Sequence, residues 1–152
     1  MELDEHKQIS SIGIESLKSQ ITKQIEEIQK IEKTYELYPE KIILGGHCQG
    51  ASLALELGSV SKEQYLGLIS LGGFKLPFPN RISPSFPKFN FLIHGNKDKD
   101  IPIENSLVSY EQLLKASHIV SKHDIVRGQG HLPNKIFAKK IRKCLKKLIK
   151  VK

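Results

Sequence analysis

The chain has 152 residues, of which 39% are hydrophobic and 26% are charged, and its formal net charge is +8. This length suffices for one domain with a hydrophobic core, so we expect a single domain over residues 1–152. An acidic N-terminus, the lack of a long apolar run and only two cysteines exclude a signal peptide, a membrane span and a disulfide framework, and indicate a soluble protein of the reducing cytoplasm.

The first half of the chain alternates helical and extended patterns. Apolar residues at steps of three and four predict an amphipathic helix over residues 9–31. Residues 42–44 are short and apolar, which is typical of a buried parallel strand. Residues 51–57 contain good helix formers without an internal Gly or Pro. Residues 65–71 predict a second buried strand, which ends at a Gly-Gly pair.

The second half continues this alternation after a loop. Four prolines make residues 75–87 a loop. We then expect a strand at 89–94, a helix at 104–116, a less hydrophobic strand near the sheet edge at 119–126, and a closing helix at 135–151. This order predicts an α/β fold, in which a mostly parallel sheet of about four strands is flanked by helices.

Residues 46–50 join the first strand to the next helix and read Gly-His-Cys-Gln-Gly, which has the form Gly-x-nucleophile-x-Gly. A turn this short holds Cys48 in a strained conformation, and we expect Gly46 and Gly50 to relieve the crowding around it. The sulfur would then lie at the amino end of a helix, where N–H groups stabilise a thiolate. A small buried hydrophobe is the alternative role for Cys48, and we interpret Cys144 as part of the core.

A thiol nucleophile needs a base and a third group that orients the base. In an open parallel sheet these partners lie on loops at the carboxyl ends of later strands. Asp98 follows the third predicted strand and His131 follows the fourth, with Asp100 as a rival acid. Considered alone, Asp98 is also a turn former and His131 a helix-start residue. We expect His94 to tie its loop to neighbouring backbone. Together, Cys48, His131 and Asp98 predict a catalytic site.

These motifs resemble the phospholipase/carboxylesterase branch of the α/β-hydrolase fold, which includes the acyl-protein thioesterases. Residues 46–51 are similar to the family's elbow, Gly-Phe-Ser-Gln-Gly-Gly, with Cys in place of Ser. Residues 94–98, followed by an Ile-Pro pair at 101–102, resemble its acid motif, and residues 128–131 resemble its histidine motif. Residues 71–77 resemble the family's Leu-Ser-Gly-aromatic-Leu-Pro segment.

The resemblance implies a role for each residue. Cys48 would be the nucleophile, His131 the general base and then acid, and Asp98 the carboxylate that orients the imidazole. The backbone N–H of Gln49 would supply one oxyanion donor. The implied activity is hydrolysis of carboxylic esters or acyl-thioesters, on a small molecule or an acylated protein, with no cofactor and no metal.

Two departures from the family pattern leave alternatives open. In having a cysteine at its elbow, the chain resembles the dienelactone-hydrolase branch of the fold, and this resemblance makes a small lactone an alternative substrate. Family members have further strands ahead of the first helix, with a His-Gly pair that gives a second oxyanion donor, and no such pair precedes Lys41. We therefore expect a truncated domain with an open sheet edge that favours self-association. A catalytically inactive hydrolase-fold fragment is the third alternative.

Much of the positive charge lies between Lys135 and Lys152. A basic helix can bind nucleic acid or the anionic face of a membrane, and more often it is simply solvated. No nucleic-acid motif accompanies the charge. We therefore expect no nucleic-acid partner and, at most, a weak contact with an anionic membrane surface.

Overall fold

The computed structural model describes residues 11–76, 82–116 and 118–150, and it divides into two units, Met1–Leu37 and Tyr38–Lys152. The first unit contains the helix α1 (Ser11–Thr34), so the predicted helix is confirmed over its described part. Ile21 is buried whereas Glu26 is exposed, as an amphipathic helix requires. Along the described residues, no helix has the length and apolar character needed to cross a membrane.

The second unit alternates strands with helices, close to where the sequence predicted them. Its elements in chain order are η1 (Pro39–Lys41), β1 (Ile43–His47), α2 (Gln49–Val60), β2 (Gly67–Leu71), β3 (Phe89–Gly95), α3 (Ile103–Leu114), β4 (Val120–Val126) and α4 (Lys135–Ile149). The main difference is that β1 runs on to His47 instead of ending at residue 44. The described parts of the predicted loop at 75–87 form neither helix nor strand, and residues 77–81 lie outside the described residues.

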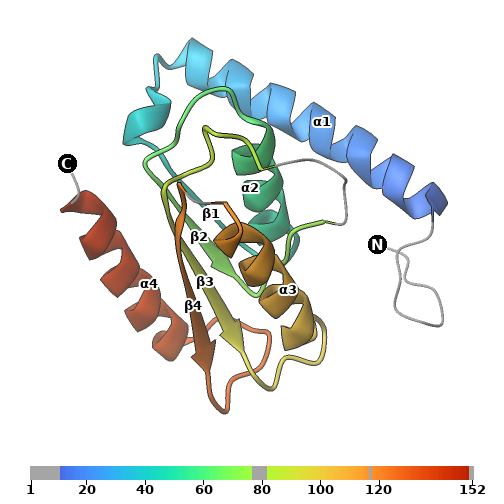
Figure 1. Cartoon of the computed structure of the whole chain (residues 1–152), viewed down its shortest axis with the longest axis vertical. Helices are drawn as coiled ribbons and strands as arrows, with labels where there is room; N and C mark the ends of the chain where they lie inside the picture. Colours follow the sequence, from blue (N-terminus) through green and yellow to red (C-terminus); the bar gives the residue numbers. More distant parts are fainter. Residues whose placement is uncertain (1–10, 77–81, 117, 151–152) are drawn as a thin grey trace. The chain divides into compact units, whose positions relative to one another are not determined.

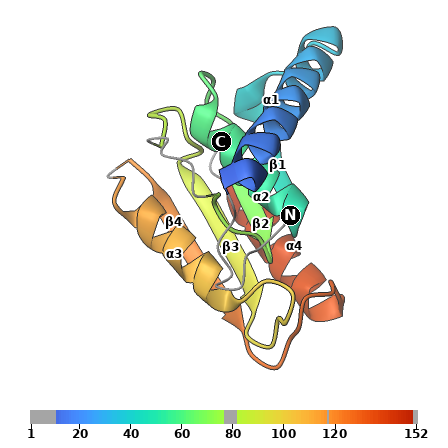
Figure 2. The same cartoon turned by 90° about the vertical axis from the view of Figure 1, so that its right-hand side faces the viewer.

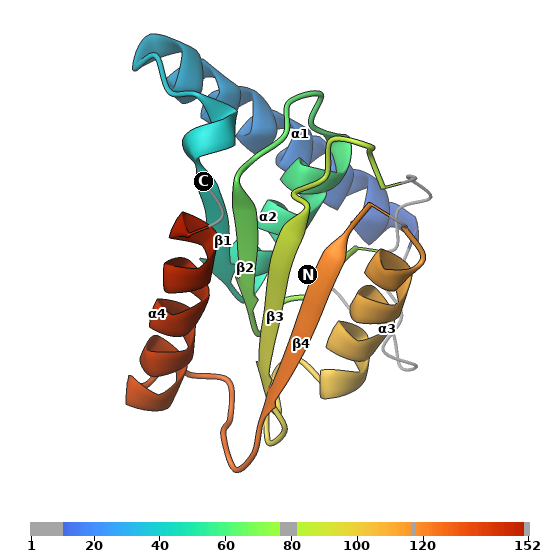
Figure 3. The ribbon, with the colours of Figure 1, turned by 60° about the vertical axis from the view of Figure 1, so that its left-hand side comes forward.

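The four strands form one parallel sheet in the order β1-β2-β3-β4, and Figure 3 shows them side by side and pointing the same way. This arrangement confirms the predicted α/β fold. It also places β4 at an edge, as its interrupted apolar pattern predicted. In the part of the chain that the structure describes, β1 forms the other edge and pairs with β2 alone.

Helices cover both faces of the sheet. Helices α2 and α3 lie on one face and α4 lies on the other (Figure 1), and the view in Figure 2 again separates α3 from α4 by the strands. The core beneath α4 comprises Ile69, Leu71, Phe91, Ile93, Val126, Phe137, Cys144 and Leu148. The predicted core position of Cys144 is therefore confirmed. Because all strands are parallel, the loops that follow β1, β3 and β4 lie at the same end of the sheet.

Candidate active site

Cys48 occupies a sharp turn between β1 and α2. Its backbone angles are φ 55° and ψ −120°, and a positive φ in a non-glycine residue costs on the order of 1–3 kcal/mol. The Cys48 N–H donates to the carbonyl of Leu71 at 3.0 Å, and its own carbonyl accepts from the N–H groups of Ala51 and Ser52 at 3.1 Å. These bonds hold the strained turn that the sequence predicted. The Cys48 side chain is half-buried.

The two glycines of this turn have different roles. A Cβ atom added to Gly46 would lie 2.2 Å from the backbone carbon of Gly50, so no other residue fits position 46 without movement. A Cβ atom on Gly50 would meet nothing within 4 Å. The expectation that Gly50 relieves crowding is therefore wrong. The close approach is between the Cα of Gly46 and the backbone of Gly50. A side chain at position 50 would itself extend into open space.

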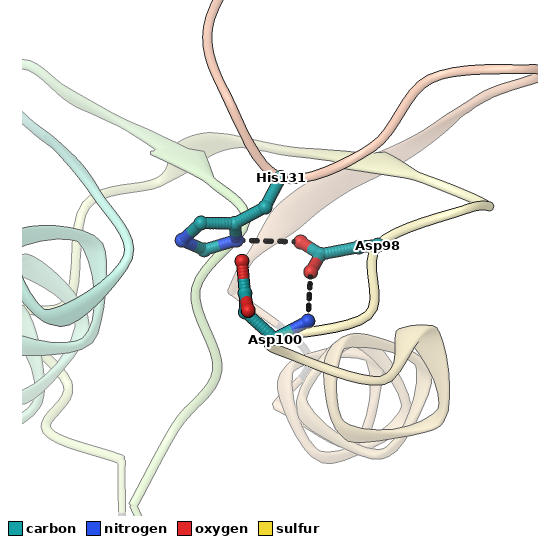
Figure 4. A group of neighbouring side chains, drawn as sticks. All are labelled: Asp98, Asp100 and His131. Carbon is teal, nitrogen blue, oxygen red and sulfur yellow. Dashed lines mark hydrogen bonds and ion pairs between the residues drawn. The ribbon is translucent and has the colours of Figure 1, made fainter.

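His131 and Asp98 form a direct pair (Figure 4). The Nδ1 atom of His131 lies 2.8 Å from Oδ2 of Asp98, and the Asp98 side chain is 1% exposed. A carboxylate only accepts hydrogen bonds, so Nδ1 carries a proton, and in the neutral imidazole Nε2 of His131 keeps its lone pair. This is the form of imidazole that can accept a proton from a nucleophile.

The environment of Asp98 favours its charged form. Burial acts to raise the pKa of Asp98, but hydrogen bonds from the N–H groups of Ile101 and Asp100 and from His131 outweigh it. The pKa of Asp98 therefore lies below its ordinary value. The rival acid, Asp100, is exposed and supplies its backbone N–H to Asp98, and the carboxylate hydrogen-bonded to His131 is that of Asp98.

The loops that carry Asp98 and His131 are tied to each other. The N–H of Lys97 donates to the carbonyl of Gln129 at 2.8 Å. A Cβ atom on Gly95 would lie 2.3 Å from that same carbonyl oxygen, so the close contact requires glycine. His94 is fully buried and its Nε2 donates to the carbonyl of Ile101 at 2.9 Å, which is the structural role expected of it.

His131 lies ahead of α4 and does not cap it. The side chain of Asn134 is the N-cap, because its Oδ1 accepts from the N–H groups of Ile136 and Phe137 at 2.9 and 3.3 Å. The alternative interpretation of His131 as a helix-start residue therefore does not apply. The imidazole of His131 is held instead by Asp98. The backbone of His131 is held by a contact that the sequence did not predict.

That contact comes from His47, the residue before Cys48. Its Nε2 donates to the carbonyl of His131 at 2.8 Å, and the two rings lie 4.6 Å apart at an angle of 44°. Gly72 is also close to this imidazole, since a Cβ atom on it would lie 3.7 Å from Nδ1 of His131, and the carbonyl of the preceding residue, Leu71, accepts from the N–H of Cys48. The structure thus brings Cys48, His131 and Asp98 to the same end of the sheet.

Residues 1–149 match the family model described as Phospholipase/Carboxylesterase. The chain belongs to this family. It is also 29% identical over 113 residues to acyl-protein thioesterase 1 homolog 2 of Dictyostelium discoideum, an alignment that covers 72% of this chain and 51% of the relative. The chain therefore spans about half the length of this relative.

Solved structures agree with the family assignment at the level of the fold. Arabidopsis thaliana SOBER1 superposes with a TM-score of 0.73 at 20% identity, covering 86% of this chain and 65% of that one. Acyl-protein thioesterase 2 of Zea mays gives a TM-score of 0.68 at 17% identity, covering 97% and 70%. The esterase PE8 gives 0.72 at 23% identity, covering 82% and 58%. These likenesses confirm the α/β-hydrolase fold.

The segment after β2 is held in place by buried polar groups. The N–H of Lys75 donates to Oγ of Ser109 at 2.7 Å, and the N–H of Leu76 donates to Oε1 of Glu56 at 2.8 Å. The ammonium of Lys75 also lies 3.6 Å from Glu56. Burial raises the pKa of Glu56, and Lys75 opposes this rise. These contacts tie Lys75 and Leu76 to α2 and α3.

Asp98, Asp100 and His131 also offer ligand atoms that lie within 4.8 Å of one another. Two carboxylates and an imidazole are suitable ligands for a divalent transition metal. A cation there would compete for Nδ1 of His131 and Oδ2 of Asp98, which already bond to each other. In this family member the three residues therefore suit the proton chemistry of an imidazole at least as well as metal binding.

Proposed function

We propose that this member of the phospholipase/carboxylesterase family hydrolyses acyl-thioesters or carboxylic esters through Cys48, His131 and Asp98. One observation carries the proposal. The strained residue of the strand–turn–helix elbow is a cysteine, and it lies at the same end of the sheet as an imidazole whose Nδ1 is bonded to a carboxylate. A nucleophile on such a turn, with a base oriented by an acid, is the arrangement that acyl transfer requires.

The reaction follows from these positions. His131 Nε2 takes the proton of the Cys48 thiol, and the sulfur attacks the acyl carbon to give a tetrahedral oxyanion. The N–H of Gln49, in the first turn of α2 where no helical carbonyl accepts from it, supports that oxyanion. The intermediate collapses as His131 protonates the departing thiol or alcohol. Water deprotonated by His131 then attacks the acyl-enzyme, and the acid and the free thiol of Cys48 are released.

The cysteine favours thioesters among these substrates. The acyl-enzyme formed on Cys48 is itself a thioester, so transfer from a thioester substrate exchanges one such bond for another. Transfer from an oxygen ester would make a more reactive bond from a less reactive one. The name of the Dictyostelium relative, an acyl-protein thioesterase homologue, supports the same substrate class. The acyl group would reside on a small molecule or on a protein.

The proposal is tested by thiol release from a short acyl-thioester. We expect Cys48→Ala to abolish turnover and Asp98→Asn to lower it by roughly 10²- to 10⁴-fold, since the imidazole loses the group that fixes its tautomer. Cys144→Ala is the matched control and should leave the rate unchanged, because Cys144 lies in the core beneath α4. Turnover of a small lactone without turnover of the thioester would favour the dienelactone-hydrolase alternative.

Alkylation with iodoacetamide near neutral pH tests the nucleophile independently of turnover. We expect Cys48 to react much faster than Cys144, because burial and then the nearby Asp124 raise the pKa of Cys144. Mass spectrometry of partly labelled protein measures the two sites. Equal labelling would contradict the role of Cys48, whereas fast labelling without hydrolysis would reject the hydrolase activity and retain the reactive thiol.

A further inference from the structure

All the charged side chains of helix α4 are basic. Its 15 residues include no acidic side chain. The basic ones are Lys135, Lys139, Lys140, Arg142, Lys143, Lys146 and Lys147. All of them are exposed apart from the half-buried Lys140. At 100° per residue they occupy one arc of the helix, opposite the buried side chains of Phe137, Cys144 and Leu148 that face the sheet.

This charge is largely uncompensated. Lys140 forms an ion pair with Asp124 at 2.8 Å. Within the described residues, the other six basic side chains of α4 have no carboxylate within ion-pair distance. A solvated protein surface usually intersperses charges of both signs. A continuous unpaired basic face instead attracts an extended anionic surface.

The basic face continues onto the neighbouring strand. A pocket between β4 and α4 is lined by Lys122, Lys143 and Lys147, and also by Asp124 and Lys140, which form an ion pair with each other. Apolar atoms of Phe91 and Ile93 contribute to its lining. An anionic group drawn to α4 would therefore meet lysines from two elements.

Near the amino end of α4, two large apolar side chains are exposed. Leu132 is 76% exposed and Ile136 is 46% exposed. Ile136 lies 7 and 11 residues before Lys143 and Lys147, so these three side chains follow one line along the helix. Nucleic acid would match the charge alone. A lipid bilayer matches both features, because its anionic headgroups overlie an apolar layer.

We propose that the outward face of α4, together with Lys122 and Leu132, is a docking surface for a bilayer that contains anionic phospholipids. The contact is electrostatic along α4 and apolar at its amino end. Because Leu132 directly follows His131, docking would bring the candidate active site to the bilayer, where acylated molecules are held. This consequence for substrate access rests on the proposed function, whereas the docking does not.

Flotation of the full chain with vesicles tests the proposal. At low salt we expect binding to phosphatidylcholine vesicles that contain phosphatidylserine, and none to phosphatidylcholine alone. The triple variant K143Q/K146Q/K147Q should partition on the order of 100-fold more weakly, because each basic residue near such a surface contributes about 1 kcal/mol, which is roughly a fivefold change. Ile136→Ser should weaken binding severalfold and leave its salt dependence unchanged.

A matched control separates this face from bulk charge. The variant K30Q/K62Q/K115Q removes the same number of exposed lysines elsewhere and should bind as the parent does. Far-ultraviolet circular dichroism and continued protection of Cys144 from alkylation establish that the α4 variants are folded. Equal losses in both triple variants, no binding at low salt, or tighter binding to a DNA duplex than to the vesicles would each overturn the proposal. None of these readouts depends on hydrolysis.

Discussion

The position of Cys48 is fixed by main-chain contacts. Its side chain makes no capping hydrogen bond to α2. The turn is held instead by the hydrogen bond from its N–H to Leu71 and by the close approach of Gly46 to Gly50. A thiol held in this way keeps its sulfur available for reaction. The orientation of the thiol depends on the strained backbone of Cys48, and that backbone depends on the close approach of Gly46 to Gly50. Substitutions at Gly46 should therefore be as damaging to activity as those at Cys48 itself.

His47 extends the support of His131 beyond Asp98. Asp98 fixes the imidazole, and His47 fixes the main chain that carries it, through the hydrogen bond at 2.8 Å to the carbonyl of His131. The donor and acceptor are 84 residues apart in the sequence. Only the folded sheet brings them together. The one sequence signal is that a histidine replaces the phenylalanine common at this position in related elbows.

We predict that the hydrogen bond of His47 matters more than its ring. His47→Phe keeps a ring beside His131 but leaves the His131 carbonyl without its donor. The turnover number for a thioester should fall about fivefold, as expected for one hydrogen bond worth about 1 kcal/mol, with little change in KM. His47→Gln retains a donor at a similar reach and should restore most of the rate. Loss in the glutamine variant with full activity in the phenylalanine variant would show that the ring contact is the important one.

The hydrophobic pattern of the sequence predicted where the helices and strands lie. The position at which β1 ends depends instead on its pairing with β2. The sequence placed the end of the first strand at residue 44, because Gly45 and Gly46 have low strand propensity. In the structure β1 continues to His47, since each of these residues pairs in register with β2 as far as Leu71. The ladder with a neighbouring strand overrides local propensity, and this information is not present in the segment itself.

His123 links β4 to α3. Its Nε2 lies 2.9 Å from Oγ of Ser106 on α3, and its ring stacks on Tyr110 at 5.4 Å. Burial lowers the pKa of His123, and the nearby His94 lowers it further, while Asp124 acts in the opposite direction. The β4–α3 contact therefore favours a neutral imidazole.

We predict that this histidine reduces stability in mild acid. Its folded-state pKa lies below the ordinary value of about 6.5, so the unfolded chain takes up the proton first. The free energy of unfolding should therefore fall as the pH drops below about 6.5. His123→Gln keeps a polar partner for Ser106 without titrating and should flatten this part of the profile. Denaturant unfolding between pH 7 and pH 5 measures the slope, and identical slopes for the two proteins would contradict the assignment.

Two other groups with shifted pKa values, Asp98 and Glu56, do not affect the comparison of the parent with the His123→Gln variant. The lowered pKa of Asp98 contributes stability at neutral pH that is lost in stronger acid, and the raised pKa of Glu56 has the opposite sign, with stability decreasing as the pH rises above about 4.5. Both groups are present in the parent and in the His123→Gln variant. The difference between the two profiles therefore isolates His123.

For the whole molecule, the order of elements was enough to predict the parallel sheet. Each strand in the second unit is followed by a helix or loop that returns the chain to the same starting end, and the motif residues all follow strands, so the candidate site could be located before any contact was known. The buried pair of Glu56 and Lys75 was not predictable. Charged residues in an amphipathic pattern are normally assigned to solvent, and only the packed segment after β2 explains their burial.

The strand β1 sets an expectation for the 152-residue chain. In a parallel sheet alternate residues of a strand direct their N–H and C=O groups to opposite neighbours. In the described residues β1 has β2 on one side and no strand on the other, so one row of these groups is free to pair with another chain. The proposed mechanism has one oxyanion donor, the N–H of Gln49, and the lack of a second such donor costs roughly 10²- to 10³-fold in turnover.

We therefore predict that the 152-residue chain self-associates and hydrolyses a short thioester only slowly. Adding the N-terminal segment of a full-length family member, fused or as a separate chain, should pair with β1, lower the oligomeric state and raise the rate through Cys48. Sedimentation velocity and thiol release measure the two effects, and the same segment with a scrambled strand is the control. With the added segment, the Cys48→Ala variant should also have a lower oligomeric state, but it should gain no activity. A monomer with ordinary esterase turnover in its absence would show that β1 needs no partner and that one oxyanion donor is enough.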